Sequence, residues 1–224
     1  MTRSLAVALS VLAAGSLSAV AAAKPPPQVG RSSLTAVAAP TTVVFGRAST
    51  ISGVVTGNMS VGAKVTLEQQ PYPYTGPFRA LATTTTLATP AGSYVFTGVR
   101  PRLHTHYRVV DHKAMATSPR VTVLVAKRVS MRVSTTRPRR GALVRFYGVV
   151  SPAHNGLVAA IQRPNGTGGW RTIKRTTLRA GTTSASSQYS VRVRINRTGN
   201  FRVRVVGDPD HLAGISAKRR LIVH

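Results

Sequence analysis

Two short runs in the last third of the chain alternate strictly between apolar residues and arginine. Residues 191–195 read Val-Arg-Val-Arg-Ile, and residues 201–205 read Phe-Arg-Val-Arg-Val. Successive side chains of a β-strand point to opposite faces of its sheet, so this alternation places the apolar side chains together on one face. Each run therefore predicts a half-buried strand whose other face carries a row of guanidinium groups.

The chain also repeats itself once. Residues 45–55 align with residues 140–150 at a spacing of 95 residues, and later matches keep a spacing between 92 and 95. Both copies consist of short alternating runs separated by Gly, Pro, Asn and Thr, without helical periodicity, which is typical of an antiparallel β-sandwich. We therefore expect an all-β chain with two tandem domains, residues 34–125 and residues 127–224.

The beginning of the chain predicts export. Arg3 is followed by a mostly apolar stretch that ends in three alanines, which is the pattern of a cleavable signal peptide over residues 1–23. Residues 24–33 are rich in proline and predict an extended linker. The mature chain has no stretch of the ~20 apolar residues that a membrane span requires. We expect a secreted, extracellular protein, free or associated with the cell wall, and the absence of cysteine excludes disulfides and thiolate metal sites.

The order of glycines and aromatic residues in the second copy is specific. It runs through Gly141, Phe146, Gly148, Gly156, Trp170, Tyr189, Phe201, Gly207 and Asp208. This order resembles the Ig-like β-sandwich repeat domains of exported actinobacterial proteins. The first copy departs from it, because Phe78 replaces the tryptophan and the final Gly-Asp is missing. The resemblance implies two Ig-like domains that serve as spacers, adhesion modules or appendages, and it implies no catalytic residue.

The sequence offers little for catalysis. The chain has four carboxylates in all, whereas acid–base catalysis usually needs a positioned carboxylate or histidine with an orienting partner. Asp208 and Asp210 flank a proline and precede His211, which predicts turn chemistry rather than a cation site. His104 and His106 are expected to be exposed loop histidines, and Trp170 a packing residue. We expect no enzyme activity, no cofactor and no metal.

Positive charge dominates the composition and is concentrated in the second copy. The chain has 31 Lys and Arg against four Asp and Glu, a net charge of +27. Residues 24–126 contain ten basic and two acidic residues, a net +8, whereas residues 127–224 contain twenty and two, a net +18. The resemblance implies that the run at 192–194 pairs with the strand of Arg145, and that Arg163, Arg219 and Arg220 lie near the run at 202–204 in the other sheet. The candidate residues for binding a polyanion are Arg139, Arg140, Arg145, Arg163, Arg192, Arg194, Arg202, Arg204, Arg219 and Arg220.

These patterns predict a non-enzymatic protein that binds an anionic cell-envelope polymer through arginine-rich strand faces. Arginine forms bidentate contacts with phosphate, and like charges opposite each other on neighbouring strands are destabilising until an anion relieves them. The alternative is a structural or protein-adhesion module with protein partners, whose charge is incidental. Extracellular nucleic acid ranks lower as a partner, because aromatic residues make up 5% of the chain and provide no stacking platform.

Overall fold

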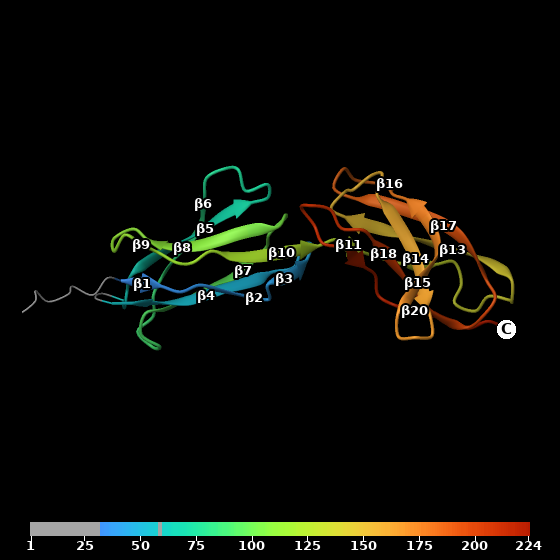
Figure 1. Ribbon diagram of the computed structural model, residues 1–224, viewed down its shortest axis with the longest axis horizontal. Coiled ribbons are helices and arrows are strands. Elements are labelled where there is room, and N and C mark those ends of the chain that lie inside the picture. Colours follow the sequence, from blue (N-terminus) through green and yellow to red (C-terminus); the bar gives the residue numbers. More distant parts are fainter. Residues whose placement is uncertain (1–31, 58–59) are drawn as a thin grey trace, which may run out of the picture.

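The computed structural model describes residues 32–57 and 60–224, and every regular element in these ranges is a β-strand (Figure 1). The expected signal peptide and nearly all of the expected linker lie outside the described residues. No helix in the described ranges is long and apolar enough to cross a membrane. The all-β prediction is confirmed. Residues 32–126 form the N-terminal half of the molecule, and residues 127–224 form the C-terminal half.

The N-terminal half contains two sheets. The first consists of β1 (Ser33–Leu34), β4 (Ser49–Thr56), β2 (Val37–Ala39) and β7 (Ser93–Val99). The second consists of β3 (Thr42–Val44), β10 (Val121–Ala126), β8 (Thr105–Asp111), β5 (Lys64–Pro71), β6 (Arg79–Thr85) and β9 (Ala116–Thr117). Neighbouring strands are antiparallel, except that β3 runs parallel to β10.

The C-terminal half also contains two sheets, and all its strand pairs are antiparallel. The first consists of β11 (Arg128–Val129), β12 (Arg132–Val133), β13 (Ala142–Ser151), β17 (Ser187–Ile195) and β16 (Arg179–Ala180). The second consists of β15 (Trp170–Thr177), β14 (Val158–Pro164), β18 (Gly199–Val205), β19 (Gly214–Ile215) and β20 (Arg219–Leu221). The two halves lie end to end along the long axis of the molecule (Figure 1).

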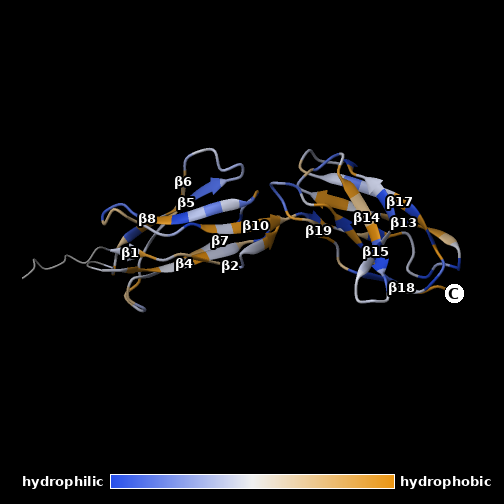
Figure 2. Ribbon diagram, in the orientation of Figure 1, coloured by the Kyte–Doolittle hydropathy of each residue, from blue (hydrophilic) through white to orange (hydrophobic). Residues whose placement is uncertain are grey.

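Each half buries its own cluster of apolar side chains. The N-terminal cluster combines Ile51 of the first sheet with Leu67 of the second, and neither is exposed. The C-terminal cluster combines Phe146 of the first sheet with Ile161 and Val203 of the second. Hydrophobic and hydrophilic residues alternate along several of these strands (Figure 2). Both halves are therefore sandwich-like, with the core between two sheets.

The two alternating arginine runs are strands, as predicted. They lie in β17 and β18, which belong to different sheets of the C-terminal half. Val193 and Val203 are buried, whereas Arg192 and Arg204 are exposed. Period-two alternation thus separates the core face of each strand from its charged face.

Equivalent tyrosines in the two halves make the same long-range hydrogen bond to the backbone. Tyr94 Oη donates a hydrogen bond to the Thr35 carbonyl oxygen, and Tyr189 Oη donates to the Ser130 carbonyl oxygen over 2.7 Å. Tyrosine and acceptor are 59 residues apart in both cases. A side chain at Gly148 would overlap the Ser130 carbonyl oxygen, which explains why this strand position has no Cβ.

A serine after the fifth long strand of each half repeats a second contact. The backbone N–H of Val109 donates to Ser118 Oγ, and the backbone N–H of Val203 donates to Ser216 Oγ, both over 2.9 Å. Each serine hydroxyl in turn donates to the carbonyl oxygen of the next residue. The sequence repeat therefore corresponds to repeated three-dimensional contacts.

Candidate functional site

Arginines face each other on the outer side of β13 and β17. Arg145 lies directly opposite Arg192 in the antiparallel register, and Leu143 lies opposite Arg194. Side chains in directly opposite positions have Cβ atoms only about 4.5–5.5 Å apart. The expected pairing of these two strands is confirmed, and it places like charges beside each other on an exposed face.

Neutral groups hold these arginines in place. Arg145 Nε donates to Ser190 Oγ over 2.7 Å, and its guanidinium carbon lies 5.0 Å from the centre of the Tyr147 ring. Arg194 Nη1 donates to the Gly141 carbonyl oxygen over 3.0 Å. Because the partners are uncharged, the side chains are positioned while their positive charge stays uncompensated.

A shallow groove crosses this charged face. It has a volume of about 680 Å³. Its polar lining includes Arg132, Arg145, Tyr147, Arg179, Gln188 and Ser190. The sequence did not single out Arg132 and Arg179, because each lies on a two-residue strand without a visible alternation. We call this hollow the face groove.

A second groove opens on the flank of the sandwich, between the edges of β15 and β17. It has a volume of about 360 Å³. Five basic side chains line it: Arg163, Lys174, Arg192, Arg194 and Arg197. We call this hollow the flank groove. It joins arginines of both sheets, and it connects with the outer face through Arg192.

The expected position of Arg163 is confirmed at the level of the strand, because β14 pairs with β18 in the second sheet. The side chain, however, lines the flank groove beside Arg192. The neighbouring residue Gln162 lies opposite Arg202 and accepts a 2.9 Å hydrogen bond from its Nε. Consecutive strand residues point to opposite faces, so Arg163 must point away from Arg202.

Arg202 belongs to a stacked group that has a counterpart in the N-terminal half. Its guanidinium carbon lies 4.1 Å from the ring centre of Trp170, just as that of Arg108 lies 4.2 Å from the ring centre of Phe78. Trp170 is therefore a recurring packing position, as predicted. Burial and nearby Arg204 lower the pKa of the Arg202 guanidinium from its ordinary value.

The hydrogen-bond partner differs between the two groups. Arg108 Nε pairs with the Glu68 carboxylate over 2.7 Å, whereas Arg202 has the neutral amide of Gln162 at the equivalent place. The N-terminal half thus neutralises this guanidinium, and the C-terminal half leaves it charged.

The remaining candidates lie at the ends and edge of the same half. Arg204 lies opposite Ala160 and Ile215 on the outer face of the second sheet. Arg219 and Arg220 lie on β20 at the edge beside β18. Arg139 and Arg140 form the turn before β13, next to the Gly141 carbonyl that Arg194 contacts. The structure therefore gathers Arg145, Arg163, Arg192 and Arg194 around the two grooves and places Arg202, Arg204, Arg219 and Arg220 elsewhere.

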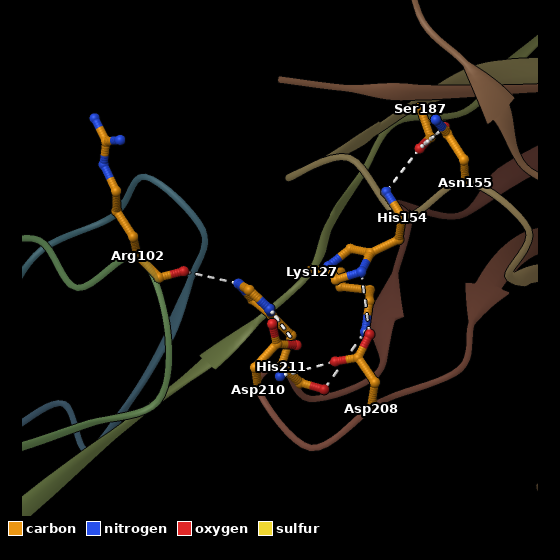
Figure 3. A network of polar contacts seen from close by, with 8 residues as sticks. All are labelled: Arg102, Lys127, His154, Asn155, Ser187, Asp208, Asp210 and His211. Atoms are coloured by element: carbon orange, nitrogen blue, oxygen red, sulfur yellow. Dashed lines mark hydrogen bonds and ion pairs between the residues drawn. The ribbon is translucent and has the colours of Figure 1, made fainter. Parts of the chain in front are cut away.

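Asp208 and Asp210, the two acidic residues of the C-terminal half, line neither groove. They lie at the junction between the two halves (Figure 3). Asp208 Oδ2 lies 2.8 Å from Lys127 Nζ and 3.1 Å from His154 Nδ1, and Asp210 Oδ1 lies 2.9 Å from His211 Nδ1. Burial alone would raise the pKa of Asp208, but side-chain hydrogen bonding and the charge of Lys127 lower it to about 2. Asp208 also accepts the backbone N–H of His211, so the predicted turn chemistry is confirmed.

The junction carries residue types that also bind metals. Nitrogen or oxygen atoms of His154, Asp208, Asp210 and His211 lie within 4.8 Å of one another. However, the ammonium group of Lys127, with a fully buried side chain, already contacts Asp208. A lysine ammonium carries three donors and a full positive charge, and it repels a metal cation. We therefore assign the group as an ion-pair cluster, which we call the junction cluster.

Two histidines expected in exposed loops are not exposed. His104 is buried beside His211, at 6.3 Å between ring centres, and its Nδ1 accepts the backbone N–H of Val125. His106 is half-buried and stacks on Tyr74 at 3.9 Å between ring centres. The prediction was wrong because long-range packing, absent from the local sequence, encloses both rings.

Neither a protein-family model nor a curated protein sequence matches this chain. The molecule itself shows contacts repeated in the two halves and two basic grooves. All four side-chain carboxylates lie apart from these grooves.

Proposed function

We propose that the chain is an exported protein made of two tandem Ig-like β-sandwich domains, residues 34–125 and residues 127–224, preceded by a cleaved signal peptide. The repeated tyrosine and serine contacts support a common ancestry of the two domains. Two sheets of mainly antiparallel strands around one core in each half support the Ig-like assignment.

We further propose that the C-terminal half binds an anionic cell-envelope polymer without catalysis. One observation carries this proposal: of the twenty Lys and Arg of residues 127–224, Lys127 alone forms an ion pair with a carboxylate. Seventeen of the others are exposed, and Arg163 and Arg202 are half-buried. A surface of uncompensated guanidinium groups attracts polyanions strongly and in a salt-dependent manner.

The arrangement of the charge favours a polymer over a small anion. The face groove and the flank groove lie along successive parts of β17, so an extended chain can contact Arg145, Arg192 and Arg194 in succession. Each guanidinium can bind a phosphate through two hydrogen bonds. Repeated phosphates along a wall polymer would therefore relieve the repulsion between opposite arginines.

The grooves favour phosphate contacts over base contacts. Two aromatic residues, Tyr147 and Tyr189, line the face groove. Arg145 covers the ring of Tyr147, and Tyr189 is buried with its hydroxyl bonded to the Ser130 carbonyl oxygen, so neither offers a free aromatic face. Sequence-independent nucleic-acid binding usually adds stacking of bases on free aromatic faces. A phosphate-bearing wall polymer fits this surface better than a single-stranded nucleic acid.

The second candidate function, a structural or adhesion module, is favoured by the position of the charge on strand edges. β15 is an edge strand, and β17 pairs with β16 through only Gln188 and Ser187 on that side. Lysine and arginine on edge strands prevent edge-to-edge aggregation. In this reading, the basic side chains protect the edges and bind nothing.

A charge-matched pair of variants separates the two functions. The C-terminal variant carries Arg145→Gln, Arg163→Gln, Arg192→Gln and Arg194→Gln. The N-terminal variant carries Arg47→Gln, Arg79→Gln, Arg100→Gln and Arg120→Gln, which are exposed arginines of the other half. Both lose four positive charges, so any difference between them reports position rather than net charge.

The measurement is retention of the full chain on isolated cell wall, with and without its phosphate polymers, across a salt series. We expect the C-terminal variant to lose roughly tenfold or more in affinity and to show a shallower salt dependence, with the N-terminal variant within about threefold of wild type. Equal losses in both variants, or retention that does not depend on salt, would contradict polymer binding and favour the structural module.

A further inference from the structure

The loop after β18 carries His211 into the contact between the two halves (Figure 3). The imidazole is buried, at 1% exposure. Its Nε2 lies 2.8 Å from the Arg102 carbonyl oxygen, and its Nδ1 lies 2.9 Å from Asp210 Oδ1. A carbonyl oxygen and a carboxylate only accept hydrogen bonds. Both contacts can therefore be hydrogen bonds only when both ring nitrogens carry a proton.

His104 shows the opposite chemistry on the N-terminal side. Its Nδ1 lies 2.9 Å from the backbone N–H of Val125, which can only donate. Nδ1 is therefore unprotonated and the ring is neutral. Burial and the adjacent His211 lower the pKa of His104, which agrees with this assignment.

His154 is the third imidazole of the group and is also neutral. Its Nδ1 lies 3.1 Å from Asp208 Oδ2, and its buried Nε2 has no hydrogen-bond partner among the described residues. A protonated Nε2 would leave a charged donor unsatisfied in the interior, which is costly. Burial and the charge of Lys127 lower the pKa of His154.

These assignments balance the charge of the junction cluster. Lys127 and His211 contribute two positive charges, and Asp208 and Asp210 contribute two negative charges. The rings of His104, His154 and Phe45 surround His211 without adding charge. A buried cluster with equal charges of both signs is tolerated, whereas removal of one member leaves an uncompensated charge.

Backbone contacts make the same loop the bridge between the halves. The Asp210 carbonyl oxygen accepts the N–H of His104 over 3.1 Å, and the N–H of Leu212 donates to the Val125 carbonyl oxygen over 2.8 Å. The Leu212 carbonyl oxygen accepts the N–H of Lys127 over 3.1 Å. The state of His211 therefore acts on the contact that sets how the halves are oriented.

We propose that the junction is a proton-dependent clamp, in which doubly protonated His211 locks the N-terminal half to the C-terminal half. The closed junction binds one proton at His211 that an open junction does not require. This inference is independent of polymer binding, because it concerns residues outside both grooves. It makes the orientation of the cationic half a function of pH.

The direction of the pH dependence follows from the same assignments. Loss of one proton from His211 would leave a nitrogen lone pair facing an oxygen and would make the cluster negative, so the junction opens. On the acidic side, His104 and His154 have pKa values below the ordinary 6.5, so the closed state loses stability as the pH falls below that value.

Two measurements on the full chain test the clamp. Because the chain has no cysteine, spin labels can be placed uniquely through Thr85→Cys on β6 and Asn200→Cys on β18, both exposed. Electron–electron distance measurements then report the orientation of the halves across a pH series. Nitrogen NMR of labelled histidine reports the protonation of each ring in the same series.

We expect a narrow distance distribution while both nitrogens of His211 are protonated. Above the midpoint, the open population should rise roughly tenfold per pH unit, as the loss of one proton requires. His211→Gln should give a broad distribution without an alkaline transition, and His112→Gln, at an exposed position, should match wild type.

Two outcomes would overturn the clamp. One is a narrow distance distribution at a pH where NMR shows a single proton on His211. This measurement needs only the wild-type protein, so it remains decisive even if the His211→Gln variant does not fold. The other is an alkaline transition that persists unchanged in folded His211→Gln.

Discussion

At the residue scale, Lys127 shows how one buried cation organises its surroundings. It directly follows β10, and its side chain is fully enclosed. Its ammonium group contacts the Asp208 carboxylate, which is 19% exposed. A lysine in this setting is stabilised by its partner and is costly without it.

We expect Lys127→Met to lower the free energy of unfolding by about 3 kcal/mol, because it strands the Asp208 carboxylate beside buried groups. The double variant Lys127→Met/Asp208→Asn should recover part of this loss, since it removes one charge of each sign. Urea unfolding measures both, with Lys64→Met, at an exposed position, as the control. A double variant less stable than the single one would show that the pair does not act as a unit.

The same pair gives the chain an acid dependence. The pKa of Asp208 lies at about 2 in the fold, below its ordinary 3.8. A lowered carboxylate pKa contributes stability that is present above the unfolded value and is lost as the pH falls through the folded value. Asp208→Asn should therefore flatten the loss of stability between about pH 4 and pH 2.

At the scale of elements, the segment around Ser130 holds β13 in place by passing close to it at Gly148. Ser130, between β11 and β12, exchanges hydrogen bonds with Val149, and its carbonyl oxygen receives the Tyr189 hydroxyl. This close approach joins β11, β12, β13 and β17 into one sheet. The alternation of apolar residues alone would allow a side chain at position 148.

We expect Gly148→Ala to lower the free energy of unfolding by about 3 kcal/mol, because the new methyl group displaces the Ser130 carbonyl and the Tyr189 hydroxyl. Gly199→Ala, where a Cβ meets no atom within 4 Å, is the matched control in the same half. Thermal and urea unfolding measure both variants. Equal stability of the two would mean that the crossing segment can move away without cost.

At the scale of the whole molecule, the net charge of +27 is distributed unevenly. In the N-terminal half, Glu68 neutralises Arg108, and the C-terminal half has its two carboxylates in the junction cluster. The positive charges on the outer faces of the C-terminal half therefore repel one another. Such repulsion destabilises a compact state and is screened by salt.

We expect added salt to raise the Tm of the full chain by roughly 4 °C, because screening weakens the repulsion between opposite arginines. The C-terminal variant should gain less from salt than the N-terminal variant, since it lacks the paired charges of β13 and β17. Calorimetry across a salt series measures this difference. Identical gains in the two variants would assign the effect to net charge rather than to the paired arginines.

The sequence by itself determined the strands, their buried faces and the repeat. Alternation of period two depends only on neighbouring residues, and it correctly placed Val193 and Val203 inside and Arg192 and Arg204 outside. The pairing of the strands that carry Arg145 and Arg192 was predicted from the resemblance to Ig-like domains, and the register confirms it.

Only the tertiary structure decided which charges meet. Arg163 follows Gln162, which lies opposite Arg202, so its side chain points to the other face of the strand. It meets Arg192 in the flank groove, where the edges of the two sheets come together. The junction cluster assembles Lys127, His154 and His211 from positions up to 84 residues apart. Burial, hydrogen-bond geometry and charge balance depend on such long-range contacts, and no local pattern of residues encodes them.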